Sequence, residues 1–370
     1  MSELRVVSTQ DLPRGPEDWR WQLQNSTRSL SDLEQALQLS ESERQGALGA
    51  ERAGLPIAIT PYYLSLMDAA DEACPIRRQV VPRAEEAELS QGDLRDPLGE
   101  EVHEVAPELV QRYPDRALLL VTDRCAVYCR FCTRSRMVGH GGGARSIERL
   151  AGAFAYLRAH PEVKDVIVSG GDVLTQATER IVQVLRALRE IKSIETIRLA
   201  TRVPVVLPQR ITDELLTALR PFHPLWVMTH FNHPKELTPE ARAACNRLAD
   251  YGFPINNHTV LLRGVNDNAA VLTELFRGLV RERVRPYYLL QADPVLGTGH
   301  LRTPLNTGIE LMRQLQGKLS GICLPKFIVD TPGGHGKVPV YPDYVVERAP
   351  GRTRFLSPTG VLVDYLDPGL

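Results

Sequence analysis

The sequence predicts an α/β fold in which six strand–helix units build a mostly parallel β-sheet. From residue 117 onward, short apolar runs of strand length alternate with amphipathic segments of helical length. This alternation is typical of a parallel sheet with right-handed crossovers. Six units form either an open doubly wound sheet or a partial barrel. In both arrangements, ligands bind at the carboxyl ends of the strands.

The elements of this repeat follow one another in a regular order. Buried strands are expected at residues 117–122, 163–169, 195–200, 225–230, 254–259 and 284–289. Helices are expected around residues 147–157, 181–191, 208–219, 239–250 and 269–281. Apolar residues recur at helical spacing in each of these segments; Ile147, Leu150 and Leu157, for example, share one face.

The residues that precede the repeat have a different character. Four leucines recur at roughly helical spacing within residues 17–46, which predicts an amphipathic helix, and a second helical piece begins near Pro61. Residues 78–105 are acidic and rich in turn signals, so we expect an extended covering arm there. The expected domains are an N-terminal helical and extended arm (1–107), the α/β body (108–300) and a small C-terminal segment (301–370).

Composition argues against several classes of partner. Lysine and arginine number 44 and aspartate and glutamate 45, so the chain lacks the basic excess that nucleic-acid or membrane-surface binding usually requires. No apolar run approaches the length of a membrane span. The N-terminus carries acidic residues and no apolar core of a signal peptide. We therefore expect a cytoplasmic protein.

Three of the six cysteines lie close together: Cys125, Cys129 and Cys132 directly follow the first predicted strand. A disulfide framework would be denser and is typical of small secreted chains, so the cluster indicates metal or redox chemistry. Three thiolates at this spacing can hold one [4Fe–4S] cubane and leave its fourth iron open to a ligand. A structural zinc site is the alternative, with His140 as the nearest fourth ligand.

The Cys-x-x-x-Cys-x-x-Cys spacing, directly after the first strand of an α/β repeat, resembles the signature of the radical S-adenosylmethionine (SAM) superfamily. The resemblance implies a partial (β/α)6 barrel. It also implies an open iron that chelates the methionine part of SAM before reductive cleavage yields a 5′-deoxyadenosyl radical. The implied SAM contacts are Ser169, Gly170, Gly171, Asp172, His230 and His258. An ordinary tight turn is the alternative for the glycine pair, and a structural hydrogen bond is the alternative for His230.

The segment PGGHGK at residues 332–337 presents one lysine, Lys337, among glycines. It could be a solvated surface lysine, which is the usual fate of this residue type. A phosphate-binding loop is a weaker interpretation, because the Walker spacing and the following Ser or Thr are missing. The third interpretation is a Schiff-base lysine for pyridoxal 5′-phosphate (PLP), whose aldehyde the small neighbours would admit.

Together, the cysteine motif and the lysine segment resemble the lysine 2,3-aminomutase family, from about residue 112 to 344. Four further stretches have that family's character: RYPDR at 112–116, THFNHP at 229–234, LLRGVND at 261–267 and RPYY at 285–288. The resemblance implies that Lys337 binds PLP. It makes Arg112, Tyr113 and Arg116 candidates for the PLP phosphate and pocket, with a surface role of the arginines as the alternative.

The two cofactors belong together chemically. Moving an amino group between neighbouring carbons requires removal of a hydrogen atom from an unactivated carbon, which no side-chain base can do. The resemblance implies that the 5′-deoxyadenosyl radical removes it while the substrate amine is held as an external aldimine of PLP. It also implies an electron donor such as flavodoxin or ferredoxin, and a homo-oligomer. The protein's share is positioning and the exclusion of water.

Charged residues predict the substrate, a free amino acid. Arg134, two residues after Cys132, could clamp the substrate carboxylate in a bidentate pair. By resemblance, Asp293 and Asp330 hold an ε-ammonium group, which predicts interconversion of L-lysine and L-β-lysine by an isomerase. The alternatives are another amino acid, such as arginine or glutamate, or a lysine of elongation factor P. Either aspartate could instead be a turn or cap residue.

The chain also departs from the family pattern. No cysteine follows Cys323, and Asn268 stands where a partner cysteine for zinc would fall, so we predict no zinc site. His258 replaces an expected glutamine, and His335 a usual glycine. Two other classes remain open: a radical SAM enzyme of another reaction type, in which Lys337 carries no cofactor, and a non-enzymatic iron–sulfur or zinc protein that senses redox state.

Overall fold

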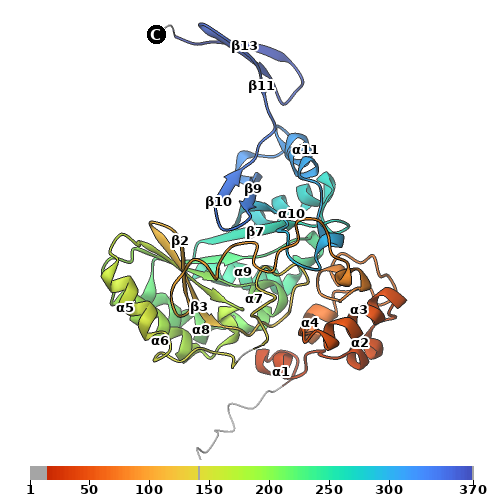
Figure 1. The fold of residues 1–370 in the computed structure, drawn as a ribbon, viewed down its shortest axis with the longest axis vertical. Helices are drawn as coiled ribbons and strands as arrows, with labels where there is room; N and C mark the ends of the chain where they lie inside the picture. Colours follow the sequence, from red (N-terminus) through yellow and green to blue (C-terminus); the bar gives the residue numbers. More distant parts are fainter. Residues whose placement is uncertain (1–14, 141, 369–370) are drawn as a thin grey trace, which may run out of the picture.

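A ten-stranded β-sheet forms the centre of the protein in the computed structural model, which describes residues 15–140 and 142–368 (Figure 1). The strands follow in sequence order from β1 to β10. Pairing is parallel from β3 through β9, and β1, β2 and β10 add antiparallel at the two edges. Among the described residues the first and last strands do not pair, so the sheet is open. This confirms the predicted α/β class with an incompletely closed sheet.

The strands of this sheet are short. They are β1 (Glu104–Ala106), β2 (Leu109–Tyr113), β3 (Arg116–Thr122), β4 (Asp165–Gly170), β5 (Thr196–Ala200), β6 (Leu225–Thr229), β7 (Ile255–Leu261), β8 (Val284–Gln291), β9 (Lys326–Thr331) and β10 (Gly336–Pro339). The six strands from β3 to β8 match the predicted apolar runs. The other four lie outside the predicted repeat, because their sequences are short or mix apolar and polar residues.

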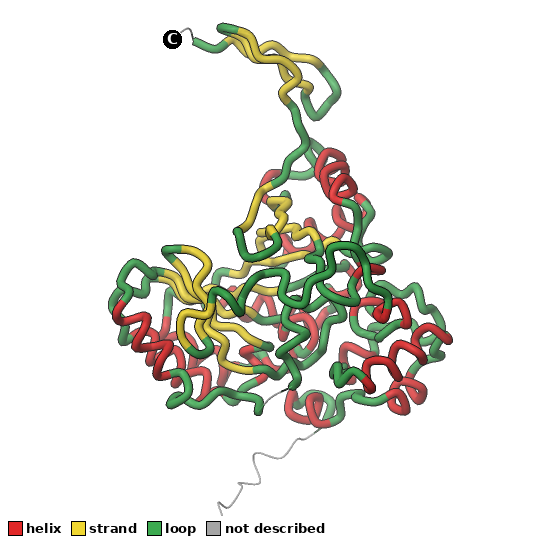
Figure 2. The backbone as a smooth tube through the Cα atoms, viewed as in Figure 1, coloured by secondary structure: helices red, strands yellow, loops and turns green. Residues whose placement is uncertain are grey.

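Helices connect the parallel strands and flank the sheet, as the red coils beside the yellow strands in Figure 2 show. The helices are α1 (Trp19–Gln24), α2 (Leu30–Ala36), α3 (Glu41–Arg52), α4 (Pro61–Leu64), α5 (Ala151–Ala159), α6 (Thr178–Arg189), α7 (Val203–Val206), α8 (Asp213–Leu219), α9 (Pro239–Asp250), α10 (Ala269–Arg281) and α11 (Leu305–Leu315). The first four precede the sheet in the chain, and α5 to α11 lie between its parallel strands. None of the helices within the described ranges has the length and apolar character needed to cross a membrane.

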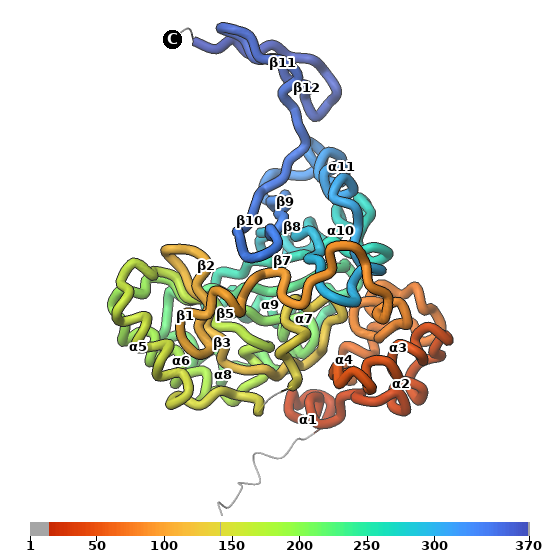
Figure 3. Tube along the Cα trace, viewed as in Figure 1, coloured from red at the N-terminus to blue at the C-terminus, as the bar shows by residue number. Residues whose placement is uncertain are grey.

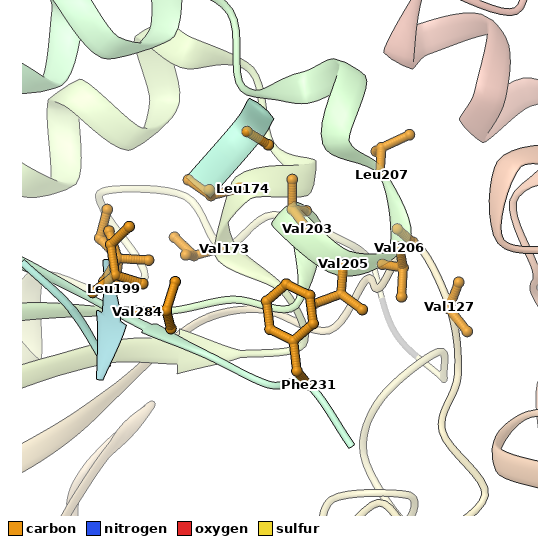
Figure 4. Close-up of a cluster of buried hydrophobic side chains, with 14 of the residues drawn as sticks. Val127, Val173, Leu174, Leu199, Val203, Val205, Val206, Leu207, Phe231 and Val284 are labelled. Carbon is orange, nitrogen blue, oxygen red and sulfur yellow. The ribbon is translucent and has the colours of Figure 1, made fainter. Parts of the chain in front are cut away.

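One cluster of buried apolar side chains joins the sheet to its helices. Figure 4 shows the part near the carboxyl end of β5, where Val203, Val205 and Val206 of α7 gather with Phe231. Val127, from the cysteine-bearing loop, belongs to the same cluster. Burying one such side chain is worth about 1.5–3 kcal/mol relative to leaving it exposed. The apolar core therefore helps to anchor the cysteine loop.

The N-terminal helices differ from the single amphipathic helix expected within residues 17–46. Ser29 and Ser40 each begin a new helix, because each hydroxyl accepts a hydrogen bond from a backbone N–H in the first turn. Asp32 and Glu43 complete the two capping boxes by accepting from the backbone of these serines. Local capping therefore overrides a continuous apolar periodicity and divides the segment into α1, α2 and α3.

The expected domain boundaries lie inside the sheet. The acidic segment 78–105 contains a short 3-10 helix (Ala84–Ala87) and ends in β1, which pairs with β2. At the other boundary, β9 and β10 of the C-terminal segment extend the sheet beyond β8. The division into 1–107, 108–300 and 301–370 stays a proposal, with the three parts sharing one sheet.

A second, separate sheet ends the chain. It contains β11 (Val345–Ala349), β12 (Arg352–Leu356) and β13 (Leu362–Leu366), paired antiparallel in that order. Figure 3 shows this sheet in dark blue, extending away from the main body. Its exposed apolar side chains are Val346, Val361, Leu362, Val363, Tyr365 and Leu366. This sheet lacks a core of its own in the described chain.

A buried ion pair holds the N-terminal helices together. The Nη2 atom of Arg77 lies 2.5 Å from Oε2 of Glu43, and the two side chains are 0% and 1% exposed. Arg77 also donates hydrogen bonds to the carbonyl oxygens of Gln38 (2.7 Å) and Ala69 (3.0 Å). The guanidinium thus joins three backbone segments that lie apart in the sequence.

Glu43→Gln should therefore destabilise the protein strongly, by about 3–5 kcal/mol, because it leaves the Arg77 charge buried without a counter-charge. Urea and thermal unfolding followed by circular dichroism measure the change. The matched control is Glu34→Gln, which breaks the exposed pair with Arg44 (46% and 44% exposed) and should cost at most about 1 kcal/mol. Equal losses of stability in the two variants would contradict this assignment.

Candidate active site

The loop after β3 carries the three predicted cluster ligands, Cys125, Cys129 and Cys132. Loss of hydration raises the pKa of Cys125 well above its usual range, and the nearby Cys132 and Cys129 add to this effect. The same cause raises the pKa of Cys132 to about 11. Stable thiolates here require a positively charged partner, and bound metal supplies such a charge. The donor set therefore fits an iron–sulfur cluster.

The arrangement of the thiols also bears on the zinc alternative. In the ranges that the structure describes, no group of three or more His, Cys, Asp or Glu side chains is placed to hold a single metal ion. A cubane distributes its cysteine ligands over separate iron atoms. His140, the candidate fourth zinc ligand, is exposed, and its Nε2 atom lies 3.1 Å from the carbonyl oxygen of Ser135.

The N-terminal segment fixes the backbone of the cysteine loop. The Tyr128 N–H donates to the carbonyl of Ala58 (3.1 Å), and the Arg130 N–H donates to that of Gln79 (2.8 Å). The Arg130 side chain also forms an ion pair with Glu86. The N-terminal residues therefore hold the loop in place in addition to covering the body.

The glycine pair after β4 has a packing role. Gly170 has a φ of +112°, and a Cβ there would lie 2.1 Å from the carbonyl oxygen of Thr122. A Cβ on Gly171 would lie 2.3 Å from the carbonyl oxygen of Arg124. The glycines thus let the end of β4 pack against the start of the cysteine loop. The sequence interpretation assigned them to close approach by a ligand, and the structure adds a close contact between two backbones as a second reason for glycine at both positions.

The carboxylate of Asp172 is occupied by protein donors. It accepts hydrogen bonds from the Thr201 hydroxyl (2.6 Å), the Arg202 N–H (2.7 Å) and the Leu174 N–H (3.1 Å). Burial raises the pKa of Asp172, and these hydrogen bonds oppose that rise. The side chain therefore joins the end of β4 to the segment after β5.

A cavity of about 500 Å³ lies within the curve of the sheet. Its volume is in the range of ordinary cofactor and ligand pockets, about 300–1,000 Å³. Strands from both edges and from the middle of the sheet contribute to its wall. The predicted site residues that line it are Arg112, Tyr113, Arg116, Arg134, Ser169, His258, Asp330 and Lys337. Those outside its lining are Cys125, Cys129, Cys132, Gly170, Gly171, Asp172, His230 and Asp293.

Lys337 lies on strand β10, whereas the sequence placed it in a glycine-rich loop. It stands opposite Asp330 of β9 in the antiparallel ladder, and its Nζ atom contacts Oδ2 of Asp330. Arg112 of β2 approaches the same carboxylate, with 3.3 Å between Nη2 and Oδ2. The backbone N–H of Lys337 donates to the hydroxyl of Tyr113 (2.9 Å). Side chains from the two edges of the open sheet therefore meet around this lysine.

Guanidinium groups gather near the lysine. The Arg116 guanidinium lies 3.6 Å from the centre of the Tyr113 ring, a cation–π contact, and pairs with Asp115 at 2.8 Å. With Arg112, it gives this wall of the cavity two fixed positive charges. An amine beside two guanidiniums fits PLP, whose aldehyde reacts with an amine and whose phosphate binds arginine.

Arg134 reaches the cavity from the cysteine loop. Its Nε and Nη2 atoms donate to Glu100 at 2.9 and 2.7 Å, and its Nη1 atom lies 3.5 Å from the hydroxyl of Ser169. Burial opposes the charge, but the carboxylate of Glu100 outweighs it and raises the pKa of Arg134. Glu100 thus fixes one edge of the guanidinium and leaves the Nη1 side facing the cavity.

Asp293 lies just outside the cavity lining, in the segment after β8. Burial raises its pKa to about 7, and the neighbouring charge of Asp330 adds to the rise, whereas Lys337 and Arg112 oppose it. Asp293 is therefore close enough to the lysine pair to interact electrostatically with it. Near neutral pH its charge depends on what binds beside it.

Of the two histidines predicted to contact SAM, His258 lines the cavity and His230 lies beside Phe131 of the cysteine loop. The Nε2 atom of His258 is buried and makes no hydrogen bond with any described residue. Loss of hydration, with a further contribution from Lys337, lowers the pKa of His258 to about 3, so the ring is neutral. Such an unsatisfied nitrogen in a cavity wall fits a polar ligand group, as expected of a SAM contact. His230 instead uses its Nε2 atom on Asn232 (3.0 Å), and loss of hydration lowers its pKa well below the usual value.

Several residues of the site were not predicted from the sequence. Glu100 lies in the acidic N-terminal segment, where no local pattern distinguishes it from its neighbours. Tyr287 and Tyr288 stack on each other at 3.8 Å and on His258. Arg202 lies two residues after the end of β5, so the strand-end rule that selected Ser169 and His230 could have found it.

Comparison with known proteins supports one family. Residues 119–275 match the model of the radical SAM superfamily, and residues 312–369 match the lysine-2,3-aminomutase model. An L-lysine 2,3-aminomutase of Fusobacterium nucleatum is 47% identical over 351 residues, which cover 95% of this chain and 82% of the relative. That of Clostridium subterminale is 46% identical, with 95% and 84% covered.

A relative named for another substrate is less similar than these two. The glutamate 2,3-aminomutase of Clostridioides difficile is 40% identical over 337 residues, covering 90% of this chain and 79% of the relative. The family resemblance stated from the cysteine motif and Lys337 is thereby confirmed. The chain belongs to the lysine 2,3-aminomutase family of the radical SAM superfamily.

Proposed function

We propose that this protein interconverts L-lysine and L-β-lysine by moving the amino group between C2 and C3. The observation that carries the proposal is one cavity that brings Lys337 and Asp330 together with Arg134, a side chain of the cysteine loop. The amine that would bind the aldehyde of PLP therefore shares a cavity with a side chain of the loop proposed to hold the cluster. The names of the relatives support lysine as the substrate.

The family uses a [4Fe–4S] cluster, SAM and PLP, and this chain offers residues for each. Cys125, Cys129 and Cys132 would ligate the cluster, and Lys337 would bind PLP. When bound, these groups supply a carbon radical that removes a hydrogen atom from an unactivated carbon and a ring that stabilises the unpaired electron. The other proposed contacts are Ser169, Gly170, Gly171, Asp172, His230 and His258 for SAM, and Arg112, Tyr113 and Arg116 for PLP.

The charges in the cavity wall are arranged for a molecule with an anionic and a cationic end. Arg134 presents its Nη1 side for the substrate carboxylate, while Glu100 keeps the other edge in place. Asp330 and Asp293 offer carboxylates for the ε-ammonium. A glutamate side chain would meet these two acids with the wrong sign of charge, which favours lysine. The side chain of arginine or of a protein-bound lysine also carries the positive charge that these acids require, but it must also fit the cavity.

Protein groups also control where protons and water go. Asp330 contacts the Nζ atom of Lys337 and can accept a proton from the ammonium, which frees the amine for its carbonyl partner. The buried face of Asp330 (5% exposed) limits solvent at this point. Fixed neighbours on β2 and β9 keep the reacting groups at constant positions, which supplies much of the catalytic effect in such sites.

Two partners complete the proposal. Reduction of the cluster requires a small one-electron donor such as a flavodoxin or ferredoxin. The sheet formed by β11, β12 and β13 exposes several apolar side chains, and an exposed apolar patch is typical of a surface that contacts another protein. We therefore propose that this sheet packs against a second copy of the chain in a homo-oligomer.

Anaerobic incubation with lysine, SAM, PLP and dithionite, after reconstitution with iron and sulfide, tests the function. We expect β-lysine from the wild type, and little or no product from arginine or glutamate assayed alongside. Lys337→Ala should lose the PLP absorbance and the borohydride-trapped adduct, with product formation at least about 10³-fold lower because the nucleophile is missing.

The matched control for this variant is Lys326→Ala, which removes an exposed lysine from the neighbouring strand β9. It should retain PLP and activity. Borohydride trapping of PLP at any lysine other than Lys337 would contradict the assignment of the site. Turnover of glutamate in preference to lysine would contradict the substrate.

The raised pKa of Asp293 predicts a pH dependence. Above about pH 7 its carboxylate is charged and can pair with the ε-ammonium of the substrate; below that pH it is protonated and the pairing is lost. We therefore expect kcat/KM for lysine to fall as the pH decreases through about 7. Asp293→Asn should remove this limb of the profile. It should also lower the plateau value of kcat/KM at least tenfold, because losing one partner of a buried charge pair costs about 2–5 kcal/mol.

Asp330 gives this prediction an internal check, because its negative charge helps to raise the pKa of Asp293. Asp330→Asn should therefore move the acidic limb to lower pH, in addition to weakening lysine binding. The pH profile of kcat/KM measures both effects. An unchanged limb in Asp293→Asn would show that another group controls the profile.

The proposed oligomer is tested by mass. Light scattering after gel filtration should give the wild type a mass well above the 41.3 kDa of one chain. Leu362→Glu combined with Leu366→Glu should shift the mass toward the monomer, because the charges oppose burial of the sheet. Ile322→Glu, at an exposed position of the main body (63% exposed), is the control. A monomeric wild type would exclude the proposal.

A further inference from the structure

A buried arginine outside the predicted site contacts a proposed cluster ligand. Arg202 lies two residues after the end of β5, and its side chain is 8% exposed. Its Nη1 atom lies 2.7 Å from Sγ of Cys129 and donates a hydrogen bond to that sulfur. Among the described residues, Nη1 has this sulfur as its hydrogen-bond acceptor. The guanidinium therefore presents one edge directly to a thiol of the cysteine loop.

The remaining edges of this guanidinium are held by other buried groups. The Nη2 atom donates to Glu236 at 2.8 Å, to the side-chain oxygen of Gln79 at 2.5 Å and to the Tyr63 hydroxyl at 3.1 Å. The Nε atom donates to the carbonyl oxygen of His230 at 3.2 Å. Glu236 and Gln79 are both 0% exposed. A side chain fixed by so many partners keeps Nη1 aimed at the sulfur.

The hydrogen bonds of Arg202 connect several segments around the cysteine loop. Gln79 and Tyr63 come from the N-terminal segment, and the backbone carbonyl of Gln79 also accepts from Arg130, next to Cys129. The backbone N–H of Arg202 donates to Asp172, at the end of β4. Arg202 thus links the cysteine loop, the glycine segment and the segment after β6.

We propose that Arg202 positions Cys129 and makes the iron–sulfur cluster easier to reduce. The inference rests on the proposed function, in which Cys129 ligates the cluster. When the cluster takes one electron from an external donor, negative charge increases on the iron–sulfur core and its cysteine sulfurs. A fixed donor to one of those sulfurs stabilises that charge, and hydrogen bonds to the sulfurs are among the determinants of cluster potential.

The effect of removing this donor on the reduction of the cluster can be predicted. A hydrogen bond to a charged group is stronger than one to a neutral group, so this donor stabilises the reduced cluster more than the oxidised one. We therefore expect Arg202→Gln to lower the ratio of reduced to oxidised cluster about tenfold at a given potential. For one electron, a tenfold change corresponds to about 59 mV in the midpoint potential.

The experiment is a redox titration of the reconstituted full-length protein, followed by electron paramagnetic resonance of the reduced cluster. Iron and sulfide contents are measured first, so that only cluster-replete protein is compared. The control variant is Arg210→Gln, which removes another buried arginine (1% exposed). Arg210 donates to Leu174, Gln176 and Thr178 and to no cysteine, so its loss should leave the potential unchanged.

A second variant separates a folding defect from the effect on the cluster. Arg202→Gln alone leaves Glu236 buried without its counter-charge, which is strongly destabilising. Arg202→Gln combined with Glu236→Gln removes both charges and should show the same downward shift of the potential. If this double variant folds, as judged by circular dichroism, but binds less iron than the wild type, the positioning of Cys129 is supported.

The outcomes distinguish the two proposals. An unchanged midpoint potential in a cluster-replete double variant would overturn the role of Arg202 and leave the proposed function intact. The same shift in Arg210→Gln would also overturn it, because loss of any buried arginine would then suffice. Failure of the wild type to assemble a [4Fe–4S] cluster would overturn the proposed function and this inference together.

Discussion

Parallel pairing of the strands β3 through β9 is the constraint on which the rest of the structure depends. It brings the carboxyl ends of these strands to one rim, so the segments that follow them meet although they are far apart in the sequence. The cysteine loop follows β3, the glycine pair ends β4, and Arg202, His230 and Asp293 come after β5, β6 and β8. Because the sheet stays open, side chains from its two edges can close around a cavity instead of around a packed barrel interior.

The cavity wall is stabilised by charges that satisfy one another. Arg134 pairs with Glu100, and Arg112 and Lys337 share the carboxylate of Asp330. A buried charge without a partner is costly, so these pairs allow a highly charged cavity to exist in a folded protein. A bound amino acid could replace one partner in such a pair, since its carboxylate can pair with an arginine and its ammonium group with an aspartate. The stability of the cavity and the proposed recognition of the substrate therefore use the same groups.

The N-terminal segment is part of the site, although the sequence suggested a covering arm. Its backbone carbonyls at Ala58 and Gln79 hold the cysteine loop, and Glu100 fixes Arg134. Tyr63 and Gln79 also contact Arg202 beside Cys129. These contacts join residues separated by 34 or more positions in the chain, so no local pattern reveals them. The environment of the proposed cluster thus depends on the packing of two parts of the chain.

The sequence by itself determined the six strands from β3 to β8, the cysteine motif and the lysine that set the family, because each is encoded by local periodicity or spacing. It also placed Ser169 at the end of a strand and Arg134 in the loop after another, and parallel pairing brings these two segments together. Only the tertiary structure decided which groups each residue contacts. It placed Lys337 in a strand opposite Asp330, gave the carboxylate of Asp172 to protein donors, and brought Glu100 and Arg202 to the site. Those pairings arise from the curvature of the sheet and from long-range packing, which no short stretch of residues encodes.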